Sequence, residues 1–474
     1  MRHFQVFIII MIGCVVNTGS ALYSTTMVQK LITNWLEKSK PGSDAVFLYS
    51  LATSLYFLGC LLGGLLFTEL STKYGRKINM LISTSVNCLG LILMSIAPLN
   101  AINSIELFIV GRVIAGFALG GLGVTVIVYI SEITPLLKRG AYTAVSMPAH
   151  LVGSLIVMIL QMDQIMGKDD LWNYVLLICT AFSLPFFITY KWIPNSPPYL
   201  RSQGRDQEAL EAVKQLFGPN STFESCKLDF DSVKTQQTSS WDEVDPTAQK
   251  PKHPIKEILT NKTLSKACLY IAILVSFTVV TGPITLSLYS RDIIEKFGFG
   301  NLSNQLLTLV LPIVRIIASL IGSYVCMKFS RRGTLIWSFS IIGVSISLLT
   351  LFGKLSENGH GETFDILNYI LILMIMAVFN IGVHTILTFI IGIECLPVKY
   401  KAIGSFIYCC ICWPGLVIVN FVYPLILRDI GVYVFLIFGG FNLVSLLFIY
   451  FRMMESKDRP SMVNFSEFEK RGYF

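Results

Sequence analysis

Charged side chains are scarce in this sequence. Only 14% of its 474 residues are Asp, Glu, Lys or Arg, whereas 53% are hydrophobic and the mean hydropathy is +0.65. A soluble domain typically carries about 25% charged residues. This chain therefore has too little polar surface to be a water-soluble globule. We predict a membrane protein that crosses the bilayer many times and is solvated mostly by lipid.

The motifs of membrane enzymes and channels are also missing. The patterns HExxH and GxSG, which mark metalloproteases and serine hydrolases, do not occur in the chain. No repeated filter segment or ring of pore charges indicates a channel. The run "YCCICW" (Cys409, Cys410, Cys412) resembles a metal site, but cysteines in an apolar helix are more often small packing residues. We expect no enzyme, no cofactor and no metal.

Long apolar runs, by contrast, recur along nearly the whole chain. A helix needs about 17 to 25 residues to cross the hydrocarbon of a bilayer, and solid apolar runs exclude a β-barrel, whose strands alternate. The first run resembles a signal peptide, but the eleven runs behind it favour an uncleaved helix. The fold class is thus an all-α membrane protein with twelve transmembrane helices, predicted at 4–28, 47–68, 78–97, 106–130, 141–161, 172–193, 266–290, 303–327, 334–353, 366–393, 403–426 and 432–452.

The basic residues predict the orientation. If residues at the ends of spans are counted with the adjoining connector, one side of the membrane holds 27 of the 37 Lys and Arg residues. Basic connectors resist translocation, so that side is cytosolic and so are both termini. The net charge of +8 is explained by this bias and by anionic inner-leaflet lipids. It requires no nucleic-acid partner.

Two short charged connectors are written with the same spacing. "ISEITPLLKRG" contains Glu132, Pro135 and Arg139 at relative positions 0, +3 and +7, and "IECLPVKYKAIG" repeats this with Glu394, Pro397 and Lys401. The connectors follow spans 4 and 10. A second pair, "KYGRKINML" and "KFSRRGTLI", follows spans 2 and 8. The chain is therefore predicted to be a duplicated six-helix unit, which is typical of transporters whose two bundles rock around a midplane site.

The duplication divides the chain into four parts. We predict an N-terminal six-helix bundle (1–193), a cytosolic loop (194–265), a C-terminal six-helix bundle (266–452) and a cytosolic tail (453–474). In the loop, "GRDQEALEAVKQLFG" has the period of a short amphipathic helix, and "DSVKTQQTSSWDEVDPTAQKPKHP" is too poor in hydrophobic residues to pack. The apolar side of the helix consists of Ala209, Leu210, Val213, Leu216 and Phe217.

The connector charges predict a cytosolic gate. Ion pairs at the helix ends can close the cytosolic mouth and break when it opens, and exposed pairs contribute only about 0–1 kcal/mol each. That weakness suits a protein whose two states differ by a few kcal/mol. The alternative is that these charges only set the topology. The predicted gate residues are Arg76, Lys77, Glu132, Arg139, Arg331, Arg332, Glu394 and Lys401.

At these residues the chain resembles the sugar porters of the major facilitator superfamily, and most of all the insect facilitated trehalose transporter-like members. The segment "GRVIAGFALGGLGVTVIVYISEITPLLKRG" is similar to the family's GR…G…YxxEixPxxxRG. "IPNSPPYLRSQGRDQEAL" resembles PESPRWL, with Asn195 for Glu and Pro198 for Arg, and "ESKDRPS" resembles PETKGxS. "KYGRK" keeps Gly75, with Thr72 where an acid is usual. The resemblance runs from the first span to the tail.

The resemblance implies a solute site in which amide side chains hydrogen-bond the sugar hydroxyls. Most of these amides are replaced here. Met147 stands for the span 5 glutamine, and Thr278 and Val279 stand for the glutamine pair of span 7. Ile284, Arg315 and Cys412 stand for asparagines, while Trp413 and Phe389 keep the aromatic positions. Losing polar partners for sugar hydroxyls is costly. The candidate cavity residues are Asn17, Met147, Thr278, Tyr289, Arg315, Thr388, Phe389 and Trp413.

Proton coupling is disfavoured. Proton-linked family members use an acid in span 1 near an arginine of span 4, and here these positions hold Asn17 and Arg112. The spans carry no Asp or Glu well inside the membrane, and a proton relay needs a titratable group. His150 and His384 are the remaining candidates, and both are interpreted as packing histidines. Arg112 is either the arginine of that pair or a structural residue bonded to carbonyls or to Glu106. Arg315 either faces the cavity or a partner, or it is snorkelled or bound to carbonyls.

The sequence thus predicts a facilitative uniporter of sugars such as trehalose or hexoses, working by alternating access in the cell membrane. Its expected partners are the solute and the membrane lipids, and the protein is expected to be a monomer. Because the amides are lost, two alternatives stay open: a transporter-like sensor, or a carrier of another polar or anionic solute.

Overall fold

The computed structural model describes residues 3–135, 142, 145–222, 260–295, 301–357, 361–390, 394–396, 401–457 and 461–470. Within these ranges the chain forms helices and turns but no strands. The chain folds as two compact units. We call Met1–Ser43 with Leu55–Ala248 the N-terminal unit, and Asp44–Ser54 with Gln249–Phe474 the C-terminal unit.

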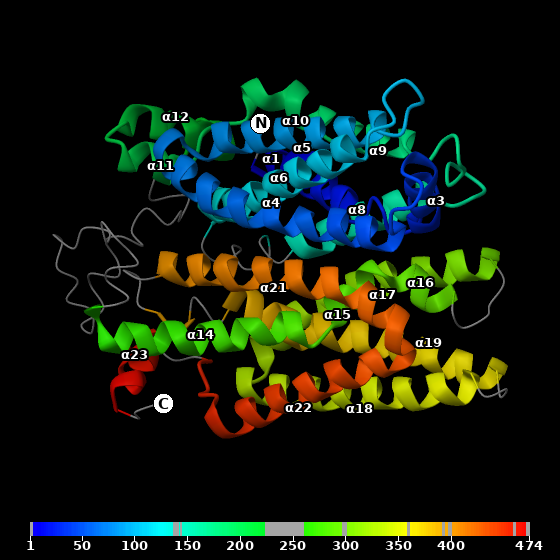
Figure 1. The fold of residues 1–474 in the computed structure, drawn as a ribbon. Helices are drawn as coiled ribbons and strands as arrows, with labels where there is room; N and C mark the ends of the chain where they lie inside the picture. The colour runs from blue at the N-terminus through cyan, green and yellow to red at the C-terminus, as the bar shows by residue number, and fades with distance from the viewer. Residues whose placement is uncertain are drawn as a thin grey trace. The chain divides into compact units, whose positions relative to one another are not determined.

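The N-terminal unit is a bundle of long helices with shorter ones, such as α11 and α12, beside them (Figure 1). The first apolar run is not a regular helix, because a π-helical segment (η1) separates α1 from α2. The elements are α1 (His3–Ile10), η1 (Met11–Val16), α2 (Asn17–Leu22), α3 (Gln29–Ser39), α4 (Ala45–Tyr74, whose first turns fall in the C-terminal unit), α5 (Arg76–Ile96), α6 (Ile105–Ile133), α8 (Ser146–Leu160), α9 (Tyr174–Ala181), α10 (Leu184–Thr189), η2 (Tyr190–Trp192), α11 (Pro197–Ser202) and α12 (Asp206–Phe217).

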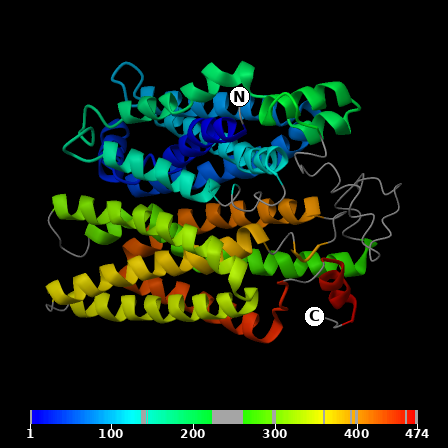
Figure 2. The same cartoon turned by 180° about the vertical axis from the view of Figure 1, so that it is seen from behind.

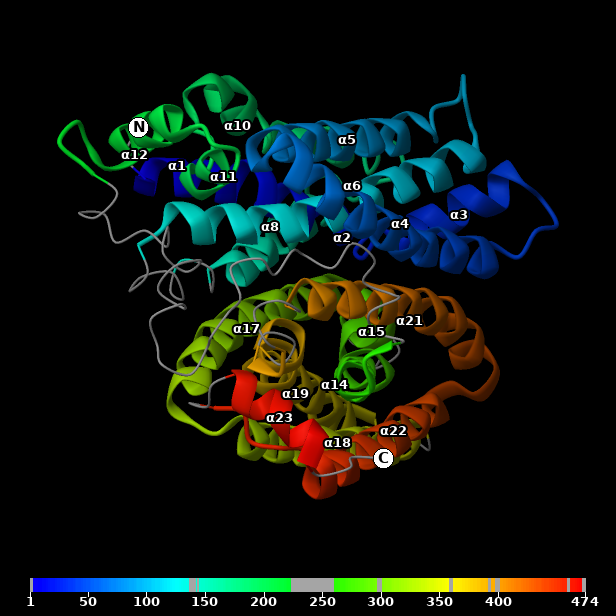
Figure 3. The ribbon, with the colours of Figure 1, turned by 90° about the vertical axis from the view of Figure 1, so that its left-hand side faces the viewer.

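The C-terminal unit is also a bundle of long helices. Figure 2 shows its lime to yellow helices α17, α18 and α19 lengthwise, and Figure 3 shows α14, α15 and α19 lying between α17, α21 and α22. The elements are α14 (Lys262–Val280), α15 (Pro283–Leu288), α16 (Ser290–Glu295), α17 (Asn301–Lys328), α18 (Arg331–Glu357), α19 (Gly361–Val378), η4 (Phe379–Val383), η5 (Thr385–Ile390), α21 (Lys401–Ile430), η7 (Gly431–Tyr433), α22 (Val434–Arg452) and α23 (Ser461–Lys470).

Ten helical stretches of the described residues are long and apolar enough to cross a membrane. One of them, Phe406–Arg452, contains both α21 and α22, and the apolar helix Ser146–Leu160 is shorter than the rest. The chain is therefore a multi-pass membrane protein. Each of the twelve predicted runs coincides with one or more helices within the described residues.

Glycines allow α4 and α6 to cross closely. A Cβ atom on Gly116 would lie 1.9 Å from the Tyr56 carbonyl oxygen, and one on Gly63 would lie 1.9 Å from the Phe117 carbonyl oxygen. Without side chains at these points, the two backbones come into direct contact, as in other small-residue crossings between membrane helices. Gly116, in the run "GFALGGLG", thus serves helix packing.

The predicted amphipathic helix of the loop is α12. Ala209, Val213 and Leu216 are fully buried, because its apolar side faces the rest of the N-terminal unit, where Leu216 joins the core around α1 and α6. The polar stretch that follows lies outside the described residues from position 223 to 259. Helix α3, between the first two spans, was not predicted.

Candidate functional site

The first cluster of charged groups lies at the junction of α4, α5, α6 and α11. Arg76, the first residue of α5, donates from its Nη2 to Glu132 Oε1 at 2.8 Å and from its Nη1 to the Ser71 carbonyl oxygen at 3.2 Å. The other carboxylate oxygen of Glu132 accepts from Ser196 Oγ at 2.5 Å. Both members of the ion pair are 16% exposed. We call Arg76, Glu132 and Ser196 the N-cluster.

Gly75 makes this junction possible. Its φ of +92° is one that only glycine adopts without strain, and the turn it forms places Arg76 at the start of α5 immediately after α4 ends. The Tyr199 ring fills the space beside Gly75 and lies 5.0 Å from the Arg76 guanidinium. The Tyr199 hydroxyl then donates to the Lys73 carbonyl oxygen at 3.1 Å. The short helix α11 is thereby fixed against the α4–α5 turn.

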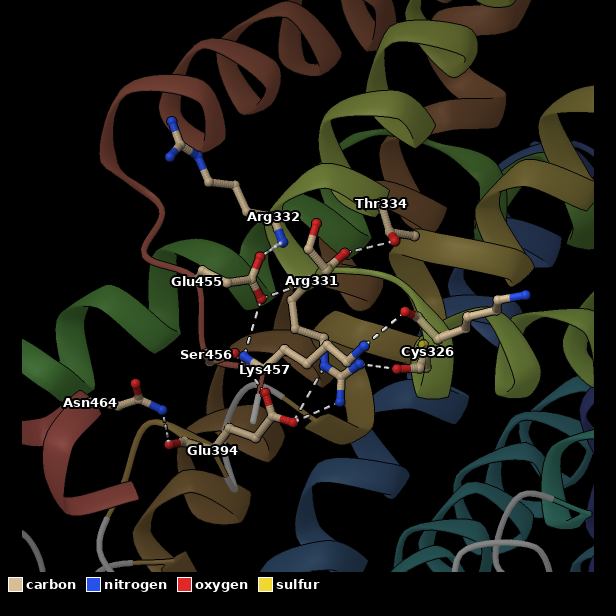
Figure 4. A network of polar contacts seen from close by, with 11 residues as sticks. Cys326, Arg331, Arg332, Thr334, Glu394, Glu455, Ser456, Lys457 and Asn464 are labelled. Atoms are coloured by element: carbon tan, nitrogen blue, oxygen red, sulfur yellow. Dashed lines mark hydrogen bonds and ion pairs between the residues drawn. The ribbon is translucent and has the colours of Figure 1, made fainter. Parts of the chain in front are cut away.

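The C-terminal unit contains a second cluster with the same connections (Figure 4). Arg331 Nη2 donates to Glu394 Oε1 at 2.9 Å, and Ser456 Oγ donates to Glu394 Oε2 at 2.6 Å. Arg331 Nη1 donates to the Cys326 carbonyl oxygen, five residues earlier, as Arg76 does to Ser71. The ion pair is 12% and 23% exposed on its two sides. We call Arg331, Glu394 and Ser456 the C-cluster.

The C-cluster has an additional acid. Glu455 accepts from the backbone N–H groups of Arg331 and Arg332 at 2.9 and 3.1 Å, which caps the first turn of α18 (Figure 4). A carboxylate there satisfies free N–H groups and complements the positive end of the helix dipole. The equivalent end of α5 has no side-chain cap, and the matching motif position holds the neutral Asn195.

The tail helix α23 also reaches the C-cluster. Asn464, which is fully buried, donates from Nδ2 to the Glu394 carbonyl oxygen at 3.0 Å. Phe468, also fully buried, packs on the Tyr270 ring of α14 with the centroids 5.3 Å apart. The residues after the last span therefore form part of the polar network at this end of the C-terminal unit.

The structure brings together four of the eight predicted gate residues as two ion pairs, Arg76–Glu132 and Arg331–Glu394. Lys77 instead lies over the Tyr190 ring at 4.6 Å, and Arg332 donates to the Tyr450 carbonyl oxygen at 2.6 Å. Arg139 and the side chain of Lys401 lie outside the described residues. Each ion pair is formed within one unit.

The predictions missed Ser196, Ser456 and Glu455. A signal for the serines was present: Ser196 follows Glu132 by 64 residues, and Ser456 follows Glu394 by 62. A hydroxyl at nearly the same distance after each repeated glutamate is part of the duplication.

Three of the predicted cavity residues of the C-terminal unit converge on a residue that was not predicted, Tyr408 of α21. The Thr388 hydroxyl of η5 hydrogen-bonds the Tyr408 phenol. The Cys412 thiol donates to the phenol oxygen at 3.3 Å. Thr278 of α14 lies beside this thiol, and its own hydroxyl donates to the Val275 carbonyl oxygen at 2.7 Å. The Trp413 ring lies 6.2 Å from the Tyr408 ring. We call Thr278, Thr388, Tyr408, Cys412 and Trp413 the tyrosine cluster.

Two other predicted cavity residues of the C-terminal unit, Tyr289 and Arg315, have surroundings different from those of the tyrosine cluster. Tyr289, at the end of α15, donates to the Asn420 carbonyl oxygen at 3.0 Å and packs against the Tyr49 and Tyr423 rings. Arg315 of α17 is 5% exposed and donates to Ser287 Oγ at 2.5 Å. The side chain of Phe389 lies outside the described residues.

In the N-terminal unit, Asn17 is fully buried and donates from Nδ2 to Ser183 Oγ at 2.6 Å. It directly follows η1, and π-helical segments inside α-helices are frequent at functional sites. Arg112 donates to the Ala21 carbonyl oxygen at 3.3 Å and lies 4.5 Å from the Tyr56 ring. Met147, at the start of α8, is half-buried.

Comparisons with known proteins agree with this architecture. The chain is 24% identical over 467 residues to the dog solute carrier family 2 facilitated glucose transporter member 3, a match that covers 96% of this chain and 90% of the relative. It is 23% identical to the major myo-inositol transporter IolT of Bacillus subtilis, covering 87% of this chain and 84% of the relative.

The fold is similar to the inward open conformation of the xylose transporter XylE from E. coli. The TM-score is 0.75 at 16% identity, and the match covers 98% of this chain and 99% of that one. The model of the sugar (and other) transporter family matches residues 6–463. Its members are transporters and not enzymes. The chain belongs to the sugar (and other) transporter family.

Proposed function

We propose that the protein is a facilitative sugar transporter of the cell membrane, with twelve spans, cytosolic termini and alternating access. The observation that carries the proposal is the pair of N- and C-clusters, which have the same arginine–glutamate–serine connections in two units of one family chain. Such duplication is typical of transporters that work by alternating access. Trehalose and hexoses are the proposed solutes.

The clusters are proposed to act as the cytosolic gate. Each cluster joins the ends of neighbouring helices, since Arg76 begins α5 and Glu132 lies in the last turn of α6. The ion pairs are partly exposed, so each contributes on the order of 1 kcal/mol. Opening the cytosolic side changes the angles between these helix ends, and weak pairs permit it without a large barrier.

Uniport is supported by Asn17. Proton-linked relatives carry an acid at this position, whereas the Asn17 amide is neutral and hydrogen-bonds Ser183. An amide does not titrate at physiological pH, so this position cannot carry a proton across the membrane. Solute would then move only down its own gradient.

Uptake into liposomes tests the proposal. Purified protein is reconstituted, and radiolabelled trehalose and D-glucose are supplied with and without a pH gradient across the bilayer. We expect saturable uptake of at least one sugar that reaches the outside concentration and is unchanged by the pH gradient. Accumulation above that concentration, driven by protons, would contradict the uniport proposal. Binding without flux would support a sensor instead.

A carrier of an anionic solute is the second candidate, and Arg315 is the observation that favours it. A guanidinium 5% exposed within an apolar helix replaces a neutral amide of the sugar-binding relatives, and an intramembrane arginine is typical of polar or anionic pathways. Competition by small carboxylates in the same liposomes separates the two. Arg315→Ala should abolish transport of an anion. Normal transport in that variant would exclude a cavity role for Arg315.

A further inference from the structure

The tyrosine cluster contains hydroxyl and thiol groups at the place where relatives carry amides. Thr278 and Cys412 stand at two of the amide positions, and both are only 1% exposed. Tyr408, Thr388 and Trp413 are each partly exposed. The buried thiol and hydroxyl therefore form the back of the cluster, and the phenol with its two neighbours forms the accessible side.

The Tyr408 hydroxyl has the hydrogen-bonding capacity to read a solute. Its oxygen accepts the weak Cys412 thiol bond at 3.3 Å, which leaves the O–H proton and a further lone pair. Thr388 contributes the other contact of the phenol. A threonine hydroxyl rotates easily, so it can release the phenol and leave the Tyr408 hydroxyl to bond an incoming hydroxyl group.

A polar group inside an apolar span faces a cavity or the bundle interior and not lipid. This applies to Tyr408, which lies two turns into α21 and whose phenol contacts Thr388 of η5 and Cys412 of its own helix. Two elements thus direct polar groups to one point. A neutral phenol in such a place suits a neutral polyhydroxylated solute better than an anion.

We propose that Tyr408 is the specificity-determining residue for the solute, and that its hydroxyl reads one sugar hydroxyl in place of the missing amides. This inference rests on the proposed function, because it names the group that recognises the transported sugar. A single hydroxyl reads one position, whereas an amide pair reads two. The transporter should therefore be strict about one hydroxyl of the sugar ring and tolerant of changes at the others.

Competition by deoxy sugars tests the inference. Uptake of radiolabelled D-glucose, or of trehalose if that is the better solute, is measured in liposomes against unlabelled 2-, 3-, 4- and 6-deoxyglucose. In the wild type, we expect one deoxy analogue to compete about tenfold less well than glucose, the effect of losing about 1.4 kcal/mol of hydrogen bonding. In Tyr408→Phe, that analogue and glucose should compete equally well against uptake of the labelled sugar. The KM of the variant for the labelled sugar should be about tenfold higher than in the wild type.

Tyr369→Phe is the matched control, because its hydroxyl donates to the Leu307 carbonyl oxygen at 2.8 Å within the same unit. It should keep the wild-type pattern of competition. Thr388→Val is the second variant. It removes a partner of the phenol but leaves Tyr408 in place, so it should weaken uptake and retain the preference at the same ring position. Loss of that preference would overturn the inference even if Tyr408→Phe does not fold.

The outcomes separate this inference from the proposed function. If the wild type moves no sugar, the proposed function fails and the inference fails with it. If the wild type transports sugar and Tyr408→Phe still discriminates at the same ring position, the proposed function is supported and the inference about Tyr408 is wrong. Loss of the preference in Thr388→Val but not in Tyr408→Phe would assign the reading to the threonine and overturn the inference.

Discussion

In the C-terminal unit, the Ser456 hydroxyl donates to Glu394 Oε2 at 2.6 Å, while Arg331 occupies the other oxygen of the same carboxylate. Ser196 and Glu132 repeat this relationship in the N-terminal unit at 2.5 Å. Each glutamate is therefore fixed from two sides, and the serine comes from the segment that follows the last helix of its bundle.

Ser456→Ala removes only one hydroxyl group, but it should change the initial rate of transport because that hydroxyl bonds Glu394. A hydrogen bond to a charged group contributes about 1.5–3 kcal/mol, and its loss loosens Glu394 in the C-cluster. We expect the initial rate of uptake in liposomes to change by about tenfold and the thermal midpoint to fall by a few degrees. Ser466→Ala is the control, since that hydroxyl bonds only to the Val463 carbonyl oxygen of its own helix. Equal uptake in the two variants would contradict the gate.

Exchanging the charges of the N-cluster tests whether the ion pair itself matters. Glu132→Arg alone places two cations together and should abolish transport. The double variant Arg76→Glu with Glu132→Arg restores attraction, and we expect it to recover part of the uptake. Full recovery is not expected, because Arg76 also donates to the Ser71 carbonyl oxygen. A double variant no better than the single one would exclude a role for the pair.

Asn17→Asp should make uptake pH-dependent. The side chain is fully buried, and burying an ionised carboxylate is costly. The protonated acid resembles the amide at low pH, whereas the ionised form at high pH is unfavourable in this site. Uptake by the variant should therefore fall as the pH rises from about 5.5 to 8. Asn17→Ala cannot titrate and should give a flat profile, and a flat profile in Asn17→Asp would contradict this reading.

Gly116→Ala should destabilise the crossing of α4 and α6. The added methyl group would lie 1.9 Å from the Tyr56 carbonyl oxygen, so the backbones must separate. Overpacking of this kind typically costs about 1–3 kcal/mol, which a thermal-shift assay in detergent detects. Gly123→Ala is the matched control in the same glycine-rich run, because a Cβ there meets nothing within 4 Å. Equal melting temperatures would refute the close crossing.

The apolar runs and the repeated connectors were sufficient to predict the membrane class, the places of the long helices and the two glutamates. These features depend on local composition and on spacing, which are visible in a chain. The contacts of Ser196 and Ser456 were not predicted, because each hydroxyl reaches its glutamate only after about sixty intervening residues have folded.

The cavity residues show the limit more sharply. Thr278, Thr388 and Trp413 were chosen by position, but Tyr408 was not, since no motif marks it and its phenol joins the cluster only when α14, η5 and α21 pack. The π-helical segments η1 and η4 were equally invisible, because one extra residue in a turn does not disturb an apolar run. Gly75 was recognised as part of a motif, but its positive φ is known only from the structure.

The carboxylate of Glu455 on the first turn of α18 has a consequence for how the two halves can diverge. The C-terminal unit caps the first turn of α18 with a charge, and the N-terminal unit, with Asn195 at the matching position and an uncapped α5, does not. Mutations near the start of α18 therefore have to preserve a charged cap, whereas mutations near the start of α5 do not. Tuning of transport speed during evolution is expected to accumulate there first.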